Sequence, residues 1–325
     1  MGRPVIVGTV RNSLGREQIG QRLSVRSLTG GQGPSGGPEA TDTIGVLVAV
    51  EADSVVLERR DGSRTKLRTD RIVAARIVPL RPRRRQPAVA IDADALTRIT
   101  SRGWPAVVSE PLGDWELRAA GGFTGRANSA AVHGDPGVPF AEATARVIDF
   151  AAHHEIAPLV QVIVDSAWER RFIDAGWESI RGPRPGAIVQ VADIGPVAHD
   201  PAIEFSPTAS DRWLRRYGRV EDPSLARAVL EGPDRVAFAT LDEVAIARVV
   251  VTGTWAGLTA LEVEPGHRRR GLARRLVLGC LAWAAERGAD KAYLQVMEDN
   301  APALAVYAPL GFTTHHAYAY LRPPS

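Results

Sequence analysis

Residues 267–277 read HRRRGLARRLV, a basic stretch with a single glycine. The stretch lies between a segment that predicts an apolar strand and one that predicts an amphipathic helix. The apolar positions that indicate these elements are Leu258, Leu261 and Val263 for the strand, ended by Pro265-Gly266, and Leu272, Leu276, Cys280 and Trp283, at helical spacing, for the helix. The stretch is therefore a strand-to-helix junction.

A junction of this kind is suited to holding a phosphate group. The first amides of a helix have no partner inside the helix, and Gly271 with the small Ala273 would let an anion approach them closely. Arg268, Arg269 and Arg270 add positive charge. The same pattern also fits a solvated basic turn before a surface helix, so residues further along the chain have to separate the two interpretations.

The segment after the helix favours the phosphate site. A break at Gly288 precedes a strand at about residues 292–296, and this strand is followed by Asn300 and a short helix. Tyr307 then stands four residues before Gly311-Phe312. The glycine loop therefore belongs to a longer ordered set of motifs.

Over residues 196–325 these motifs resemble the GNAT superfamily of acetyl-CoA-dependent N-acetyltransferases. Arg268, Gly271 and Ala273 match the family's Arg/Gln-x-x-Gly-x-Gly/Ala loop, which holds the pyrophosphate of coenzyme A through backbone amides. Asn300 and Tyr307 match its later Asn and its Tyr general acid. The resemblance implies an α/β (α+β) fold with a mixed central sheet flanked by helices, and acetyl-CoA as co-substrate. The residues it implies at the cofactor are Leu261, Val263, Arg268, Arg269, Arg270, Gly271, Leu272, Ala273, Arg274 and Asn300.

Within this fold we expect helices at residues 211–217 and 225–230 and strands at residues 236–241, 244–251 and 258–263. Asp242-Glu243 would turn the first two strands. In GNAT proteins the last of these strands splays from the strand near Leu294, and pantetheine enters the gap between them.

Acetyl transfer from a thioester to an amine needs a neutral amine, a polarised carbonyl and a proton for the departing thiolate. The resemblance gives the last task to Tyr307, because a phenol with a pKa of about 10 can protonate a thiolate whose conjugate acid has a pKa of about 8.5. Packing against Phe312 is the structural alternative for this ring. Glu262 and Glu264 share one face of the strand, and they are either general bases or solvent-exposed side chains.

Composition limits the other classes of protein. A chain of 325 residues allows two or three domains. Cys280 is the only cysteine, so neither an intrachain disulfide nor a cysteine-based metal site is expected. Adjacent residues His315 and His316 should point to opposite faces of a hairpin, and with His267 they form no convincing metal set. The sequence has no long uncharged apolar run and no secretion signal. This argues against membrane insertion and secretion and favours a cytoplasmic location.

The N-terminal part of the chain is basic. Residues 1–85 hold 16 Lys and Arg against 8 Asp and Glu, a net charge of +8 that leaves −5 for the rest of a chain whose total is +3. Part of the excess is the run of residues 81–85, RPRRR, which either meets nucleic acid or forms a solvated linker. Short strands at residues 23–26, 44–50, 54–58, 65–67 and 72–78, a turn at Asp61-Gly62 and a flexible loop at residues 29–42 predict a small antiparallel barrel, similar to the SH3-like barrels before GNAT modules in some actinobacterial proteins.

Residues 86–195 carry a pattern that recurs later in the chain. Phe150-Ala151-Ala152, Gln161 and Gly176-Trp177 parallel Trp283-Ala284-Ala285, Gln295 and Gly311-Phe312 with intervals that agree within one residue. This indicates an internal repeat of the kind found in tandem GNAT proteins, with domains at residues 1–85, 86–195 and 196–325.

The first copy lacks the residues that carry the chemistry. Its loop at residues 133–139 reads HGDPGVP, whose prolines remove amide donors and whose aspartate repels phosphate, and Phe172 stands at the position of Tyr307. We therefore expect one cofactor site. Chance similarity of two helix-strand-helix units is the alternative.

The acceptor is a primary amine, either of an amino acid such as glutamate or of a lysine on a basic DNA-associated protein, such as a histone-like protein. A glutamate acceptor would require two arginines in the pocket, for which Arg126 and Arg248 are the candidates, although the segment around Arg126 also fits a plain glycine bend. The second hypothesis is an acetyl-CoA-sensing protein whose N-terminal barrel binds nucleic acid or a partner. A homodimer is left open.

Overall fold

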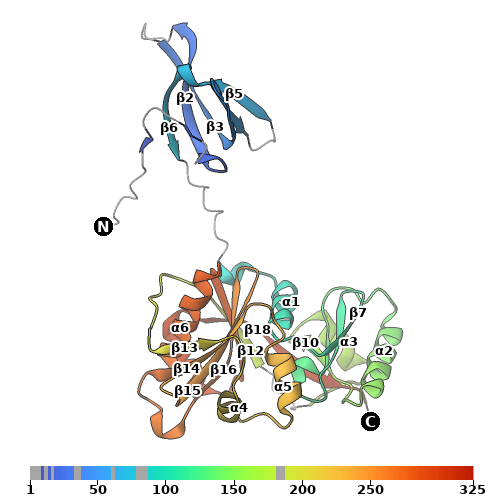
Figure 1. Ribbon diagram of the computed structural model, residues 1–325. Helices are drawn as coiled ribbons and strands as arrows, with labels where there is room; N and C mark the ends of the chain where they lie inside the picture. The colour runs from blue at the N-terminus through green and yellow to red at the C-terminus, as the bar shows by residue number, and fades with distance from the viewer. Residues whose placement is uncertain are drawn as a thin grey trace. The chain divides into compact units, whose positions relative to one another are not determined.

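The computed structural model describes residues 9–10, 14–15, 18–32, 38–59, 63–77, 87–180 and 187–324. It forms two compact units, residues 1–85 and residues 86–325 (Figure 1). The predicted turn at residues 61–62 and the basic run at residues 81–85 lie outside the described ranges.

The first unit is one antiparallel sheet in the order β1-β6-β2-β3-β4-β5. Its strands are β1 (Thr9–Val10), β2 (Arg22–Gln32), β3 (Pro38–Val50), β4 (Ser54–Glu58), β5 (Arg64–Arg68) and β6 (Ile72–Ile77), with a 3-10 turn at Thr69–Arg71. Leu23, Val25, Leu47, Val55 and Leu57 are fully buried in its core. Within the described ranges no pairing joins β1 to β5, so the sheet is not a closed barrel.

The flexible loop predicted at residues 29–42 is wrong for most of its length. β2 continues to Gln32 and β3 begins at Pro38, and these two residues pair with each other. An irregularity in the register after Leu28 absorbs the glycines, including Gly30 at φ +90°. Most of the residues that predicted a loop therefore lie in the two strands of a long hairpin.

The second unit is a mixed sheet with helices on both faces. Its helices are α1 (Ala93–Gly103), α2 (Phe140–His153), α3 (Ala167–Asp174), α4 (Asp211–Tyr217), α5 (Pro223–Leu230), α6 (Leu272–Glu286) and α7 (Ala301–Tyr307), with 3-10 turns at Ala88–Ala90, Gly125–Ala127, Pro265–His267 and Ala308–Leu310. Its strands are β7 (Val108–Leu112), β8 (Trp115–Ala119), β9 (Ala130–Ala131), β10 (Val160–Ile163), β11 (Glu178–Ser179), β12 (Ala187–Asp193), β13 (Ile203–Ser206), β14 (Val236–Leu241), β15 (Ala245–Thr252), β16 (Trp255–Val263), β17 (Lys291–Val296) and β18 (Thr313–Arg322). The expected helices and strands between residues 211 and 263 are confirmed, and Asp242 and Glu243 turn β14 into β15 at positive φ.

The sheet runs without a break in the order β13-β14-β15-β16-β17-β12-β18-β10-β9-β8-β7, with β11 beside β18. β12 lies between β17 and β18, and β18 also pairs with β10. In Figure 1, β18 reaches from β12 to the region of β10 and α3. Two strands distant in sequence from their neighbours therefore join the earlier and later parts of residues 86–325 into one sheet.

Both faces of the central strands are buried. On β17, Leu294 packs into the cluster that includes α6, whereas the adjacent Tyr293 packs toward α1 on the other face. The predicted apolar stripe of α6 is confirmed, because Leu276 and Cys280 are fully buried against β14–β17. Burial raises the pKa of the Cys280 thiol to about 12, which fits a core residue.

The prediction that His315 and His316 point to opposite faces is wrong. Val189 pairs with His316 and Gln190 with Thr314, so His315 is an extra residue in a bulge. The bulge brings the two rings together, with their Nδ1 atoms 2.8 Å apart, and His315 Nε2 lies 2.7 Å from the carbonyl oxygen of Ile91.

This pair makes stability depend on pH. Burial, with a smaller contribution from His315, lowers the pKa of His316 to about 4 from 6.5. The unfolded chain therefore binds more protons between these values, so stability contributed by neutral His316 is present above pH 6.5 and lost as the pH falls toward 4. We expect His316→Gln to flatten the fall in unfolding midpoint between pH 6.5 and 4, measured by chemical denaturation. An unchanged slope would contradict this.

None of the helices in the described ranges is long and apolar enough to cross a membrane. The same residues contain no cluster of three or more His, Cys, Asp or Glu side chains placed to hold a metal ion.

Candidate active site

A cavity of about 840 Å³ opens where β16 separates from β17. The two strands pair in parallel only from Trp255 opposite Lys291 to Leu258 opposite Leu294. Beyond this point Gln295 and Val296 keep their pairing with β12 on the other edge of β17, but have no pairing with β16. The second half of β16 therefore lines the cavity with a backbone edge that no neighbouring strand occupies on that side.

A bulge in β16 causes the separation. Across β15, Ile246 pairs with Glu262 and Arg248 with Thr259, so β16 holds one residue more than its partner. Ala260, at φ +53°, adopts the left-handed conformation at this step. Alanine rarely occupies that region, and the sequence analysis missed this position because nothing in its residue type marks it.

The loop before α6 presents its backbone toward the same cavity. Gly271 is in the left-handed region at φ +78° and Arg269 at φ +59°. No side chain caps α6 in the described residues, so the first-turn amides of Leu272, Ala273 and Arg274 lack a capping partner. Alternating conformations of this kind form a concave set of N–H donors suited to an anion.

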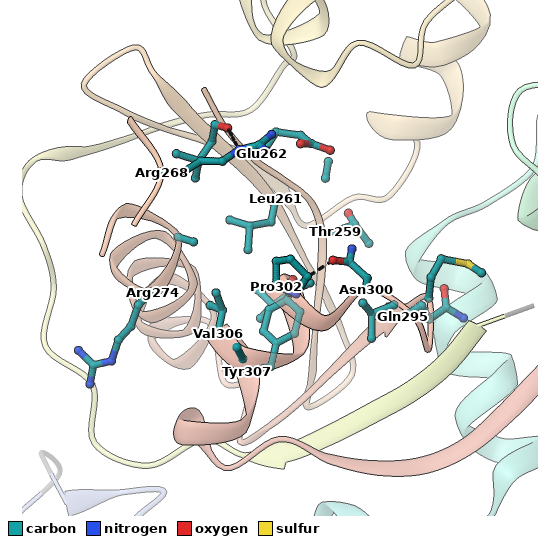
Figure 2. Close-up of a pocket in the computed structure, with 18 of the residues that line it drawn as sticks. Thr259, Leu261, Glu262, Arg268, Arg274, Gln295, Asn300, Pro302, Val306 and Tyr307 are labelled. Carbon is teal, nitrogen blue, oxygen red and sulfur yellow. Dashed lines mark hydrogen bonds between the residues drawn. The ribbon is translucent and has the colours of Figure 1, made fainter. Parts of the chain in front are cut away.

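The predicted loop residues divide by position. Arg268, Arg269, Gly271, Leu272, Ala273 and Arg274 line the cavity together with Leu261 and Val263, whereas Arg270 is outside its lining. Arg268 Nε donates to the carbonyl oxygen of Val263 at 3.1 Å, which ties the loop to the end of β16. Figure 2 shows the Arg274 side chain extending away from Tyr307.

Tyr307 and Asn300 lie at the two ends of α7, and both line the cavity. Asn300 is the N-cap, and its Oδ1 accepts from the amide of Ala303 at 3.2 Å (Figure 2). The Tyr307 ring is 7 % exposed and packs 5.7 Å from Phe312. Burial, with a smaller contribution from Glu262, raises the pKa of its phenol to about 12. At this pKa the hydroxyl stays protonated. It has no hydrogen-bond partner among the described residues, so it is free to donate.

The two glutamates on this strand have different surroundings. Glu262 lines the cavity and forms an ion pair with Arg219 at 3.1 Å. Glu264 follows the end of β16, pairs with Arg216 at 3.2 Å, and is not among the described residues that line the cavity. Of the two glutamates, only Glu262 therefore lines the cavity that Tyr307 also lines.

Comparison with known proteins agrees with this geometry. Residues 92–321 match the family described as "Probable histone acetyltransferase Rv0428c C-terminal". The chain is 30 % identical over 320 residues to the "Probable histone acetyltransferase Rv0428c" of Mycobacterium tuberculosis, covering 93 % of this chain and 95 % of that protein. The chain belongs to this family of GNAT acetyltransferases.

One further relative and one solved structure of the same fold are similar to this chain. The GNAT chain is 25 % identical over 252 residues to the "Uncharacterized N-acetyltransferase YobR" of Bacillus subtilis, covering 71 % of this chain and 99 % of that one. A solved "GCN5-related N-acetyltransferase from Kribbella flavida" shares the fold with a TM-score of 0.50, at 17 % identity and coverage of 72 % and 96 %. The protein is thus an acyltransferase, and GNAT acetyltransferases use acetyl-CoA.

The two arginines considered for a carboxylate take different places in this GNAT protein. Arg126 lines the cavity. Arg248 is fully buried outside the cavity lining, and it donates to the carbonyl oxygens of Leu230 at 2.8 Å and of Gly103 at 3.0 Å. The proposed pair is therefore wrong for Arg248, which is absent from the cavity lining and makes its hydrogen bonds inside the fold.

The earlier part of this GNAT unit repeats the order helix, strand, helix in α2, β10 and α3, as in α6, β17 and α7. Its loop before α2 is occupied by the chain's own carboxylates. Asp114 accepts from the amide of Asp135 at 2.9 Å, and Asp135 accepts from the amide of Gly137 at 2.8 Å. Phe172 is fully buried against Trp115 and Trp177.

Proposed function

We propose that this protein transfers an acetyl group from acetyl-CoA to a primary amine in the cavity between β16 and β17. The observation that carries the proposal is the uncapped start of α6, with its left-handed Gly271, opening into the same cavity as Tyr307. Acetyl-CoA would supply the acetyl thioester. Its diphosphate is suited to the amides of Leu272, Ala273 and Arg274, with Arg268 and Arg269 adding positive charge.

The described residues offer a division of labour for the transfer. The amine nitrogen forms a bond to the thioester carbonyl carbon, the carbon–sulfur bond breaks, and Tyr307 gives its hydroxyl proton to the sulfur. A backbone N–H on the free side of β16, near Leu261 and Val263, would hold the carbonyl oxygen. Burial keeps Tyr307 protonated. Its hydroxyl proton is therefore still present at the pH values at which the acceptor amine becomes neutral.

Glu262 is the better of the two candidate bases. It lines the same cavity as Tyr307, and its charge contributes to the raised pKa of that phenol. It would accept the proton that the amine loses, directly or through water. Glu264, paired with Arg216 beyond the cavity, would serve only to hold the end of β16.

The acceptor belongs to one of two classes, a free amino acid or a protein lysine. The name of the Mycobacterium tuberculosis relative refers to histones, which supports the lysine. The glutamate hypothesis loses one of its two arginines, because Arg248 makes its hydrogen bonds inside the fold.

The parts of the chain before residue 196 would play supporting roles. We infer that residues 86–195 form a GNAT-like half without a cofactor site of its own, since aspartates fill its loop and Phe172 replaces the tyrosine. Residues 1–85 would be an SH3-like module, supported by the antiparallel order and single apolar core of its sheet.

Release of free thiol from acetyl-CoA, screened across amino acids, polyamines and basic peptides, tests the proposed function. Turnover with at least one amine is expected. Binding of acetyl-CoA without turnover of any amine would replace the proposal by an acetyl-CoA-sensing role.

Gly271→Asp is expected to raise the dissociation constant of coenzyme A about 100-fold. An aspartate there meets strain of roughly 1–2 kcal/mol from its positive φ and places negative charge at the anion site. Calorimetric titration measures the effect.

Gly288→Asp is the matched control, because Gly288 follows the other end of α6 at φ +87° and, like Gly271, has open space around it. It should lose stability without losing coenzyme A affinity. Equal weakening of binding in both variants would show that the loop has no special role.

A further inference from the structure

One arginine in the cavity carries positive charge that no described carboxylate neutralises. Arg126 has no carboxylate within ion-pair distance in the described parts of the chain. Among the described residues its one hydrogen bond is to the neutral Oε1 of Gln295, which leaves most of its five N–H donors without a partner there. By contrast, Arg219 at the same cavity is paired with Glu262.

A second positive charge lies nearby. The guanidinium of Arg248 is 5.1 Å from the centre of the Trp104 ring, and that of Arg126 is 4.1 Å from it. Arg248 is fully buried, and its acceptors in the described ranges are carbonyl oxygens and the hydroxyl of Thr259. Burial lowers its pKa to about 10, and the charge of Arg126 contributes to that shift. This region of the site thus has an excess of positive charge.

The segment that carries Arg126 is held rigidly by Asn128. This buried amide uses its full hydrogen-bonding capacity: Oδ1 accepts from the amides of Ala120 and Gly122, and Nδ2 donates to the carbonyls of Phe123 and Thr124, all at 2.8–2.9 Å. Trp104 lies against the guanidinium and donates its indole N–H to Thr124. Such support fixes one orientation for a side chain that otherwise has many rotamers.

The position of Arg126 suits the acceptor better than the cofactor. Figure 2 places Arg268 and Arg274 on one side of Tyr307 and Gln295 and Thr259 on the other. Because Arg126 bonds to Gln295, it lies on the side away from the loop proposed for the diphosphate. Its planar fork of donors matches a carboxylate in a bidentate arrangement.

We propose that Arg126, supplied by the part of the chain that has no cofactor site, binds a carboxylate carried by the acceptor amine. The inference rests on the proposed acetyltransferase function and favours, of its two acceptor classes, small amino-acid-like amines over the protein lysine to which the relative's name points. Asn128 is then a positioning residue for Arg126.

Matched acceptor pairs that differ only in the carboxylate test this. L-lysine against 1,5-diaminopentane and L-tyrosine against tyramine are assayed with the full chain by thiol release, and their binding in the presence of coenzyme A is measured by calorimetry. We expect the carboxylated member of at least one pair to be preferred about 10- to 100-fold in kcat/KM or in Kd. Arg126→Gln should remove this preference, because it removes the one charge-assisted contact with the carboxylate. The dissociation constant of acetyl-CoA should stay within about 3-fold of the wild-type value.

Asn128→Ala should reduce the same preference less than Arg126→Gln does, and Arg146→Gln, an exposed substitution on α2, is the control for folding. Equal treatment of both members of every pair by the wild-type protein, in turnover and in binding, overturns the proposal. So does weaker acetyl-CoA binding in Arg126→Gln, which would assign the arginine to a phosphate of the cofactor. Because binding is measured without turnover, a protein that transfers no acetyl group would refute the proposed function while leaving the carboxylate result readable.

Discussion

Tyr307→Phe is expected to lower kcat by about 10²- to 10⁴-fold while the dissociation constant of acetyl-CoA stays unchanged. The substitution removes the hydroxyl that would protonate the departing thiolate and keeps the ring that packs on Phe312. Because the pKa of Tyr307 is about 12, the wild-type rate should show no fall from ionisation of this group below pH 10. Pre-steady-state thiol release and calorimetric titration measure the two quantities.

Tyr293→Phe is the matched control for this experiment. Tyr293 is also buried with a pKa raised to about 12, but it lies outside the lining of the cavity. Its removal should leave kcat unchanged. A Tyr307→Phe variant that binds acetyl-CoA and turns over at the wild-type rate would eliminate Tyr307 as the general acid.

Arg248→Ala is expected to destabilise the protein by about 3–5 kcal/mol, through lost packing and through buried carbonyls that lose their donor. The truncation leaves a cavity and deprives the carbonyls of Gly103 and Leu230, at the ends of α1 and α5, of their donor. Urea unfolding followed by tryptophan fluorescence measures the change.

Arg235→Ala serves as the comparison, since Arg235 also donates to two carbonyls but is exposed. It should change the unfolding free energy by less than about 0.5 kcal/mol, as surface substitutions usually do. A fall in the unfolding free energy of less than about 1 kcal/mol for Arg248→Ala would contradict this. It would mean that α1 and α5 shift at little cost to satisfy the carbonyls that Arg248 leaves.

Local patterns in the sequence foretold the local structure of residues 196–325. The apolar spacing around Leu276 and Cys280 gave α6 its buried face, and Gly271 occupies the positive φ for which glycine is suited. Turn composition misled in the N-terminal unit, where the glycines near Gly30 lie in strands. Propensity describes a residue alone, whereas pairing with β3 decides that segment.

Features that depend on pairing between distant segments could not be predicted from the sequence. The register across β15 forces the left-handed Ala260, and the register across β12 turns His315 toward His316. The contact of Arg126 with Gln295 joins residues far apart in the chain, so spacing alone could not separate it from Arg248. Both arginines were candidates for binding a carboxylate because both are positively charged. Their burial, which the sequence does not show, distinguishes them.

The placement of β18 between β12 and β10 also bears on how the chain folds during synthesis. β10 and β12 leave the ribosome long before β18, and each then exposes a sheet edge that β18 will later cover. Nascent chains in this state present the open backbone that invites mispairing with other chains, until translation supplies the missing strand. The sheet is therefore complete only after β18 has been translated and has paired with both strands.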